Sequence, residues 1–287
     1  MADHHNNRMG FDPPMTDSVA SPIRVDRRDA VATIRISRPA QLNAFDPDSV
    51  RLLLSAVQDV GHDHTIRAVI ITGEGTAFSS GGDVAEMRKH MKVGDLSRLF
   101  TELTGTLEQA IRTIIGMKKP VVAAIPGVAA GGGLALALAC DWRIGSTNAL
   151  LVPAFSGIGA VPDGGLTYFL PHFVGLGIAQ ELLFSHSRVK AERARELGLL
   201  HEVVAPEELE ARTWAKAMEL ATGPTRAYAA TKQLLVSSFG TSVETQLALE
   251  RRYAVEAALG PEIAEGLEAW GEKRKPEFPP PPDPEFQ

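Results

Sequence analysis

The sequence repeats one pattern: a short apolar run, then a loop that contains glycine, then a segment with helical character. The runs cover residues 68–73, 120–125 and 142–144, and glycine-bearing loops follow at 73–83, 127–133 and 152–165. A strand that is apolar at successive positions is buried on both faces, as in parallel sheets that helices cover. The alternation of strands and helices therefore predicts an α/β fold.

The last third of the sequence is expected to be helical. The segments 191–199, 206–221, 224–237, 242–259 and 261–275 are typical of helices, and proline or serine stands at most of their starts. We therefore divide the chain into a disordered N-terminal tail (1–21), an α/β core (22–190), a helical region (191–275) and a proline-rich tail (276–287). Such a helical region can cover a site or pack against another subunit.

Composition argues against two classes of function. The formal net charge of -6 gives a nucleic-acid role no electrostatic support. The uncharged segment 121–140 could span a bilayer, but Pro126 and the glycine triplet 131–133 indicate a strand, a turn and a buried helix, so no membrane role is expected. The first residues lack a signal-like apolar core, which favours the cytoplasm. The single cysteine, Cys140, lies in an apolar run and is interpreted as a buried structural thiol.

Two aspartates are predicted to begin helices. Asp46 precedes Pro47, which fits an N-cap followed by proline at the first helical position. Asp83 is followed three residues later by Glu86, as in a capping box. We therefore interpret Asp83 as an N-cap rather than as a catalytic acid.

Two glycine loops, residues 77–83 and 127–133, are the strongest candidates for chemistry. Each follows a predicted buried strand and precedes a helix. Glycine allows a ligand to approach the backbone closely, and a helix N-terminus offers free N–H groups. Two such donors that converge on one oxygen form an oxyanion hole. The alternative is that both loops are tight structural turns, and neither has the lysine or the spacing of a phosphate-binding or dinucleotide-binding loop.

The two glycine loops belong to a series of short sequence motifs that occur in a definite order along the chain. In chain order the segments are Arg38-Pro39, Leu42-Asn43-Ala44, Ala77-Phe78-Ser79-Ser80-Gly81-Gly82-Asp83-Val84, Lys119-Pro120-Val121, Ile125-Pro126-Gly127, Gly131-Gly132-Gly133, Cys140-Asp141, Pro162-Asp163-Gly164-Gly165, Gly198-Leu199 and Glu272-Lys273-Arg274-Lys275-Pro276. Over about residues 25–278 the chain resembles the crotonase superfamily, also called the enoyl-CoA hydratase/isomerase family.

The resemblance implies an α/β crotonase (ClpP-like) spiral of strand-strand-helix repeats with a helical C-terminal trimerisation region. It implies a homotrimer or a dimer of trimers that binds an acyl-CoA thioester. It implies no metal and no separate cofactor, since coenzyme A is part of the substrate.

The resemblance also implies roles for individual residues. The N–H groups of Gly82 and Gly132 correspond to the two oxyanion donors. The segment Leu42, Asn43 and Ala44 corresponds to a loop that borders CoA. Lys273 and Phe278 correspond to residues that reach a neighbouring subunit's nucleotide. The basic stretch 273–275 could meet CoA phosphates, or it could be an ordinary solvated helix end.

The chain departs from the pattern of family hydratases, which use two glutamates. One of these would stand two residues after the glycine triplet, where this chain has Ala135, and the other falls nearest Phe155. The available acid is Asp163, in a loop that resembles that of single-aspartate isomerase branches.

Asp163 has apolar and glycine neighbours, so burial should raise its pKa and make it a better base. The alternative is a structural role, either as an N-cap on a helix near Leu166 or as a turn aspartate. The acyl pocket is assigned to Met87, Phe100, Ala135 and Phe155. The first hypothesis is an enzyme that shifts a double bond in an enoyl-CoA. The alternatives are a hydratase or other enolate reaction with one acid, and an acyl-CoA-binding protein without catalysis.

Overall fold

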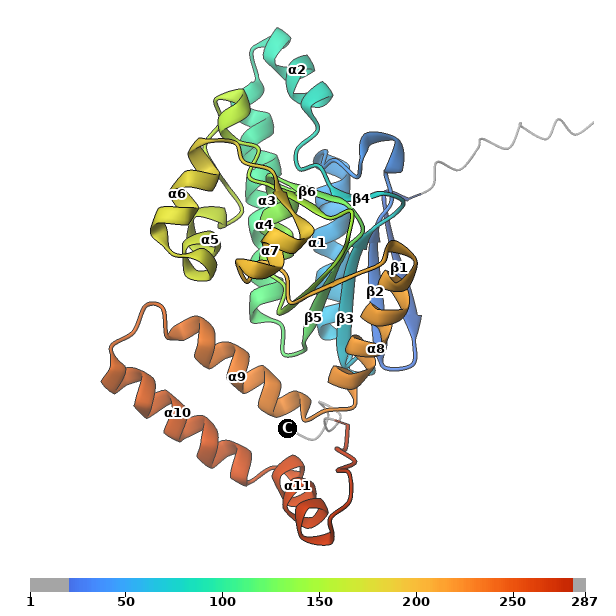
Figure 1. Ribbon diagram of the computed structural model, residues 1–287, viewed down its shortest axis with the longest axis vertical. Coiled ribbons are helices and arrows are strands. Elements are labelled where there is room, and N and C mark those ends of the chain that lie inside the picture. Colours follow the sequence, from blue (N-terminus) through green and yellow to red (C-terminus); the bar gives the residue numbers. More distant parts are fainter. Residues whose placement is uncertain (1–20, 281–287) are drawn as a thin grey trace, which may run out of the picture.

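The computed structural model describes residues 21–280, so the predicted N-terminal tail (1–21) lies outside the described residues except for Ser21, as do residues 281–287 of the predicted proline-rich tail (276–287). Within this range the chain forms two sheets, surrounded by helices (Figure 1). The strands of the larger sheet are β1 (Ile23–Arg28), β2 (Val31–Ile36), β3 (Ala68–Gly73), β5 (Val121–Ile125), β7 (Trp142–Ser146) and β10 (Glu202–Val204), in that order across the sheet. All neighbours are parallel except β1 and β2.

The larger sheet is covered on both faces, which explains the continuous apolar runs. All six residues of β3 are buried. Val69 and Ile71 belong to a core cluster on one face, and Ala68 and Ile70 to a second cluster on the other. Since successive strand residues point to opposite faces, both faces of the strand must be apolar.

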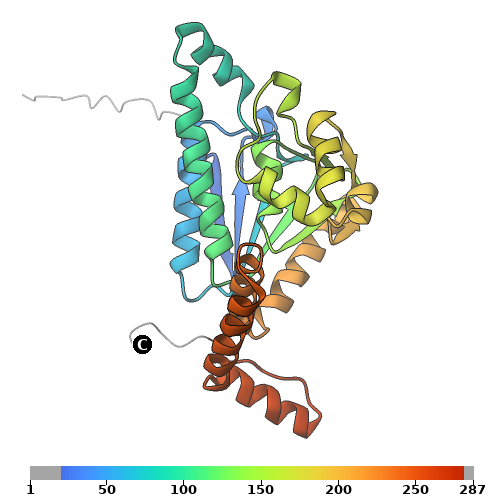
Figure 2. The same ribbon diagram turned by 90° about the vertical axis from the view of Figure 1, so that its left-hand side faces the viewer.

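Helices α1 (Pro47–His62) and α3 (Leu96–Gly116) pack side by side over one face of this sheet (Figure 2). Helix α8 (Leu209–Ala221) covers the opposite face through Leu209, Ala217 and Ala221. As predicted, α1 begins after Asp46, whose carboxylate accepts a hydrogen bond from the Ser49 N–H at 2.8 Å.

The smaller sheet makes the repeats visible. Its strands are β4 (Ala77–Ser79), β6 (Val128–Ala130), β8 (Leu150–Val152) and β9 (Val189–Lys190), in that order. β4, β6 and β8 each follow a strand of the larger sheet within a few residues and precede α2 (Val84–Val93), α4 (Gly132–Leu138) and α5 (Leu166–Val174), respectively. The fold is thus the expected series of strand-strand-helix units. The uncharged segment 121–140 forms β5, β6 and α4, and no helix within residues 21–280 is long and apolar enough to cross a membrane.

The C-terminal third is helical, as predicted, with one exception. Helices α7 (Ala191–Glu196), α8, α9 (Thr225–Ser237), α10 (Val243–Ala258) and α11 (Pro261–Glu272) match the predicted segments, and α6 (Leu176–Phe184) precedes them. The exception is β10, which pairs with β7 and extends the larger sheet. Helices α9, α10 and α11 project beyond the sheets, at the end of the molecule opposite α2 (Figure 1).

Candidate active site

The first glycine loop joins β4 to α2. Gly81 has a φ of 85°, a conformation that side chains disfavour, and Gly82 follows it. A parallel bridge links Gly82 to Phe45, since the Phe45 N–H donates to the Gly81 carbonyl at 2.7 Å and the Asp83 N–H donates to the Phe45 carbonyl at 2.8 Å. Asp83 accepts hydrogen bonds from the N–H groups of Ala85 and Glu86, which confirms it as the N-cap of α2.

The second glycine loop joins β6 to α4 and lies against the first. A Cβ atom built on Gly133 would come within 2.5 Å of the Ser79 carbonyl oxygen, so only glycine permits this approach of the two loops. A Cβ on Gly81 would lie 3.3 Å from the Gly132 nitrogen. Gly132 is the first residue of α4, so its N–H has no acceptor within the helix. The two loops thus pack against each other near Gly82 and Gly132.

A cavity of about 260 Å³ opens beside these loops, and both Gly82 and Gly132 line it. Its walls are mostly apolar and come from α1, α2, α3 and the segment before α5. The other lining residues are Phe45, Val50, Ser80, Val84, Met87, Phe100, Leu103, Thr104, Leu107, Gly131, Ala154, Phe155, Ile158, Ala160, Asp163 and His186. This is an apolar site with a few polar groups, as small-molecule pockets usually are.

Asp163 faces this cavity and does not cap a helix. The residue that precedes α5 is Gly165, and no side-chain cap is present there. A Cβ on Gly132 would lie 3.9 Å from Asp163 Oδ1, so the carboxylate stands next to the second glycine loop. Within residues 21–280 no hydrogen bond to its side chain is found. Burial raises the pKa of Asp163 from its ordinary value to about 6.

Three of the four residues assigned to the acyl pocket line the cavity. Met87, Phe100 and Phe155 are among its walls. Ala135 is not, and here the prediction needs correction: Ala135 is fully buried beneath Gly164, where a Cβ would come within 2.8 Å of the alanine methyl group. Because residue 164 is glycine, its backbone can pack directly on Ala135, and this contact separates Ala135 from the cavity.

The loop assigned to CoA adjoins two cavity residues, Phe45 and Ser80, but none of its three residues lines the cavity itself. Leu42 is exposed, and its carbonyl accepts a hydrogen bond from the N–H of Ser80, a cavity residue. Asn43 is fully buried, and its amide donates to the carbonyls of Glu74 and Ala77. Ala44 is also buried. Asn43 therefore fixes the loop internally, and the exposed side chain here is that of Leu42.

Lys273 and Phe278 do not meet the cavity of their own chain. Lys273 follows α11 in a left-handed conformation. The carbonyl of Phe278 accepts a hydrogen bond from Arg67 at 3.3 Å, beside a separate groove between the core and the C-terminal helices. Contact with a neighbouring subunit's nucleotide stays a prediction.

His186 lines the cavity although no motif in the sequence pointed to it. It lies between α6 and β9 with a φ of 51°, and its ring packs on Gly157, where a Cβ would come within 2.8 Å of the imidazole. Its buried Nδ1 has no hydrogen-bond partner among the described residues. The histidine stands outside the motifs that form the glycine loops, so no local pattern indicated it.

The comparisons with known proteins agree with this architecture. Residues 26–280 match the model of the family described as enoyl-CoA hydratase/isomerase. Over 248 residues the chain is 35% identical to the 1,2-epoxyphenylacetyl-CoA isomerase of Escherichia coli, covering 86% of this chain and 94% of that protein. It is 31% identical to the short-chain-enoyl-CoA hydratase of Clostridium acetobutylicum, covering 88% of this chain and 95% of the relative.

The fold is similar to that of solved structures. An enoyl-CoA hydratase from Polaromonas sp. JS666 superposes with a TM-score of 0.85 at 30% identity, covering 90% of this chain and 99% of that one. The fold is that of the crotonase superfamily. The chain belongs to its enoyl-CoA hydratase/isomerase family, and an acyl-CoA thioester is accordingly its class of substrate.

Proposed function

We propose that this protein shifts a double bond in an enoyl-CoA, with Asp163 as the base and the N–H groups of Gly82 and Gly132 as the oxyanion donors. The observation that carries the proposal is the chemistry of the cavity wall. Among the described residues that line the cavity, Asp163 is the one carboxylate. A single base suffices for isomerisation, because the proton that it removes returns to the same substrate.

The proposed reaction has two proton transfers. The Asp163 carboxylate removes a proton from C2 of a 3-enoyl thioester, and the electron pair moves toward the thioester oxygen. The two N–H donors stabilise the resulting dienolate. The protonated Asp163 then donates the same proton to C4, which gives the conjugated 2-enoyl thioester. No metal or redox cofactor takes part in this proposal.

The pKa of Asp163 suits this role. At about 6, the group is ionised at neutral pH and is a stronger base than an ordinary carboxylate. The cavity that Asp163 faces is mostly apolar, with Phe100 and Phe155 among its walls, which favours return of the proton to the substrate over exchange with solvent.

Hydration is the second candidate, because several of the similar proteins are named hydratases. The lone carboxylate argues against the two-acid form of that reaction. A third candidate, an acyl-CoA binder without catalysis, would need only the two donors and the cavity.

Ultraviolet absorbance of the conjugated thioester distinguishes the three candidates. A medium-chain 3-enoyl-CoA should gain this absorbance in the presence of the protein. Loss of absorbance from a 2-enoyl-CoA, without a gain from the 3-enoyl-CoA, would support hydration instead. Binding of both esters with neither change would support the non-catalytic binder.

We also propose a homotrimer or a dimer of trimers. Helices α10 and α11 and the short link between them expose large apolar side chains, which favours packing against another copy. Among these side chains are Leu247, Val255, Leu259, Leu267 and Trp270. Light scattering should give three or six chain masses, and a monomer mass would contradict this. The cytoplasmic location stays a prediction.

A further inference from the structure

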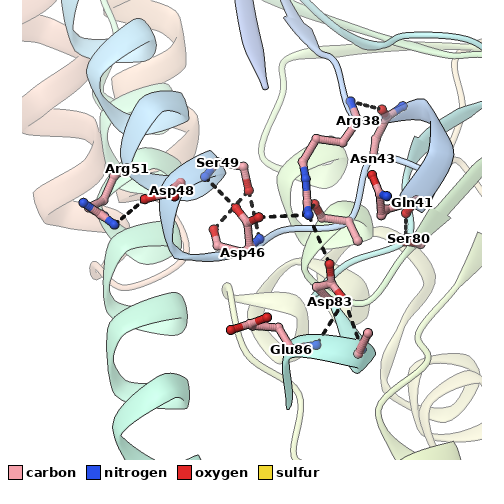
Figure 3. Close-up of polar contacts among 12 residues, drawn as sticks. Arg38, Gln41, Asn43, Asp46, Asp48, Ser49, Arg51, Ser80, Asp83 and Glu86 are labelled. Carbon is pink, nitrogen blue, oxygen red and sulfur yellow. Dashed lines mark hydrogen bonds and ion pairs between the residues drawn. The ribbon is translucent and has the colours of Figure 1, made fainter. Parts of the chain in front are cut away.

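Arg38 joins the two segments that fix the first glycine loop. Its guanidinium Nη2 lies 2.9 Å from Asp46 Oδ2 and 3.2 Å from Asp83 Oδ2, and its Nη1 donates to the Ala44 carbonyl (Figure 3). Its own backbone N–H donates to Asn43 Oδ1 at 2.9 Å. One side chain thus contacts the loop of residues 43–46 and the residue that directly follows Gly82.

Each aspartate divides its two oxygens between a helix and this arginine. Asp46 Oδ1 accepts from the Ser49 N–H, and Asp83 Oδ1 accepts from the Ala85 N–H at 3.0 Å. The other oxygen of each faces Arg38. The N-caps of α1 and α2 are therefore linked through a single guanidinium, whose planar fork suits two carboxylates.

The contacts are partly shielded from water. The side chains of Arg38, Asp46 and Asp83 are 17%, 24% and 13% exposed. Charge pairs at such exposure are screened less than surface pairs. Without Arg38, two carboxylates would face each other with no opposite charge between them, and their repulsion would act directly on Asp83.

The position of Gly82 depends on the same segments. Its neighbours on both sides are bonded to Phe45, which lies between Ala44 and Asp46. The Arg38 side chain contacts both Ala44 and Asp46, the residues on either side of Phe45. It also contacts Asp83, which follows Gly82. Arg38 itself does not line the cavity.

We propose that Arg38 is a positioning residue for the oxyanion donor at Gly82. Its guanidinium fixes the angle at which the Gly82 N–H meets the thioester oxygen, so that this donor and that of Gly132 act on the same atom. This inference rests on the proposed oxyanion hole. It does not depend on whether the protein isomerises, hydrates or only binds its ester.

The test uses a spectrum of a bound ligand rather than turnover. The probe is 3-phenylpropenoyl-CoA, a conjugated thioester whose absorbance moves to longer wavelength when its carbonyl is polarised by hydrogen bonds. The full chain with Arg38→Met is compared with the wild type. The matched control is Arg27→Met, which removes an arginine whose partner, Asp63, lies away from the cavity.

In Arg38→Met we expect the wavelength shift to fall by at least half, while the dissociation constant of the ester changes by less than about threefold. Turnover, where present, should show a kcat lower by about 10- to 100-fold with KM little changed, because one donor is misplaced while the groups that bind the rest of the ester stay in position. Arg38→Lys should recover part of the shift. Arg27→Met should leave the shift and kcat unchanged.

A second variant covers the case in which Arg38→Met fails to fold. Asp83→Asn keeps an N-cap side chain but removes one of the two charge pairs, so it should lose part of the shift. A full wild-type shift in folded Arg38→Met, or in Asp83→Asn where Arg38→Met does not fold, would overturn the proposal. The absence of any shift in the wild type would overturn the oxyanion hole, and this inference with it.

Discussion

Asp83 and Asp163 each stand in a turn before a helix beside the cavity, and their carboxylates have opposite surroundings. Asp83 accepts hydrogen bonds from two helix N–H groups and pairs with Arg38. Asp163 caps no helix, and burial raises its pKa to about 6. The comparison teaches that a satisfied carboxylate supports the backbone, whereas one that is buried without partners among the described residues stays basic and can accept a proton.

The largest expected difference between the two aspartates concerns turnover. Asp163→Asn should lower kcat by about 100-fold or more, because the amide cannot accept the substrate proton. Asp83→Asn should lower it far less, since it changes the angle of one donor only. Steady-state kinetics on a 3-enoyl-CoA measure both variants, and equal losses would remove the distinction between base and cap.

The turn that carries Asp163 should be sensitive to added bulk at Gly164. Gly164 has a φ of 60°, and a Cβ there would meet the Ala135 methyl group at 2.8 Å. Gly164→Ala should therefore lower the free energy of unfolding by about 2–3 kcal/mol.

A matched control separates strain from packing. Gly159 has a φ of 71° but open space around it, so Gly159→Ala should cost only the backbone strain, about 1 kcal/mol. Urea unfolding measures both variants. Equal losses would show that contact with Ala135 does not constrain the turn.

Activity should follow the ionisation of Asp163. Because burial raises its pKa to about 6, kcat/KM should be constant above that pH and fall about tenfold per unit below it. A pH profile measured between about 4.5 and 8 on roughly half-unit steps tests this. A midpoint near 4 would mean that the carboxylate is solvated in the free protein.

The smallest expected effect is the change in the free energy of unfolding when either aspartate is replaced by asparagine, and the sign of this change differs between Asp163 and Asp83. The pKa of Asp163 is about 6 in the folded protein against 3.8 for an unperturbed aspartate, so the ionised group destabilises the folded state fully above about pH 6 and not below pH 3.8. Asp163→Asn should therefore raise the free energy of unfolding by about 1 kcal/mol at pH 8, after allowance for partial solvation. Asp83→Asn should lower it by up to about 1 kcal/mol, because its ion pair with Arg38 is removed. Thermal unfolding at pH 8 and pH 4 would contradict this account if the gain for Asp163→Asn persisted at the lower pH.

The sequence predicted what local chemistry determines. The buried runs of β3 and β5, the caps at Asp46 and Asp83, and the paired glycine loops all follow from neighbouring residues. For Asp163 the sequence left two roles open, a base in the cavity or a structural residue of the turn, and its apolar neighbours favoured the first. In the structure Asp163 lines the cavity, and no side chain caps α5.

The rest depends on contacts between distant segments. β10 spans three residues and exists because it pairs with β7, so no periodicity indicated it. Ala135 was assigned to the cavity by its place after the glycine triplet, but the backbone at Gly164 packs directly on its methyl group and covers it. His186 enters the cavity only because Gly157, far away in sequence, leaves room for its ring.

The strand order of the larger sheet bears on how the chain assembles during synthesis. From β1 to β10 the strands lie side by side in the order in which the ribosome produces them. Each new strand therefore finds its neighbouring strand already synthesised. We expect nascent chains to gain protease resistance in increments as β3, β5 and β7 emerge. A single late step after β10 would contradict this. Sequential growth of this kind would limit the time for which the apolar edge strands stand unpaired.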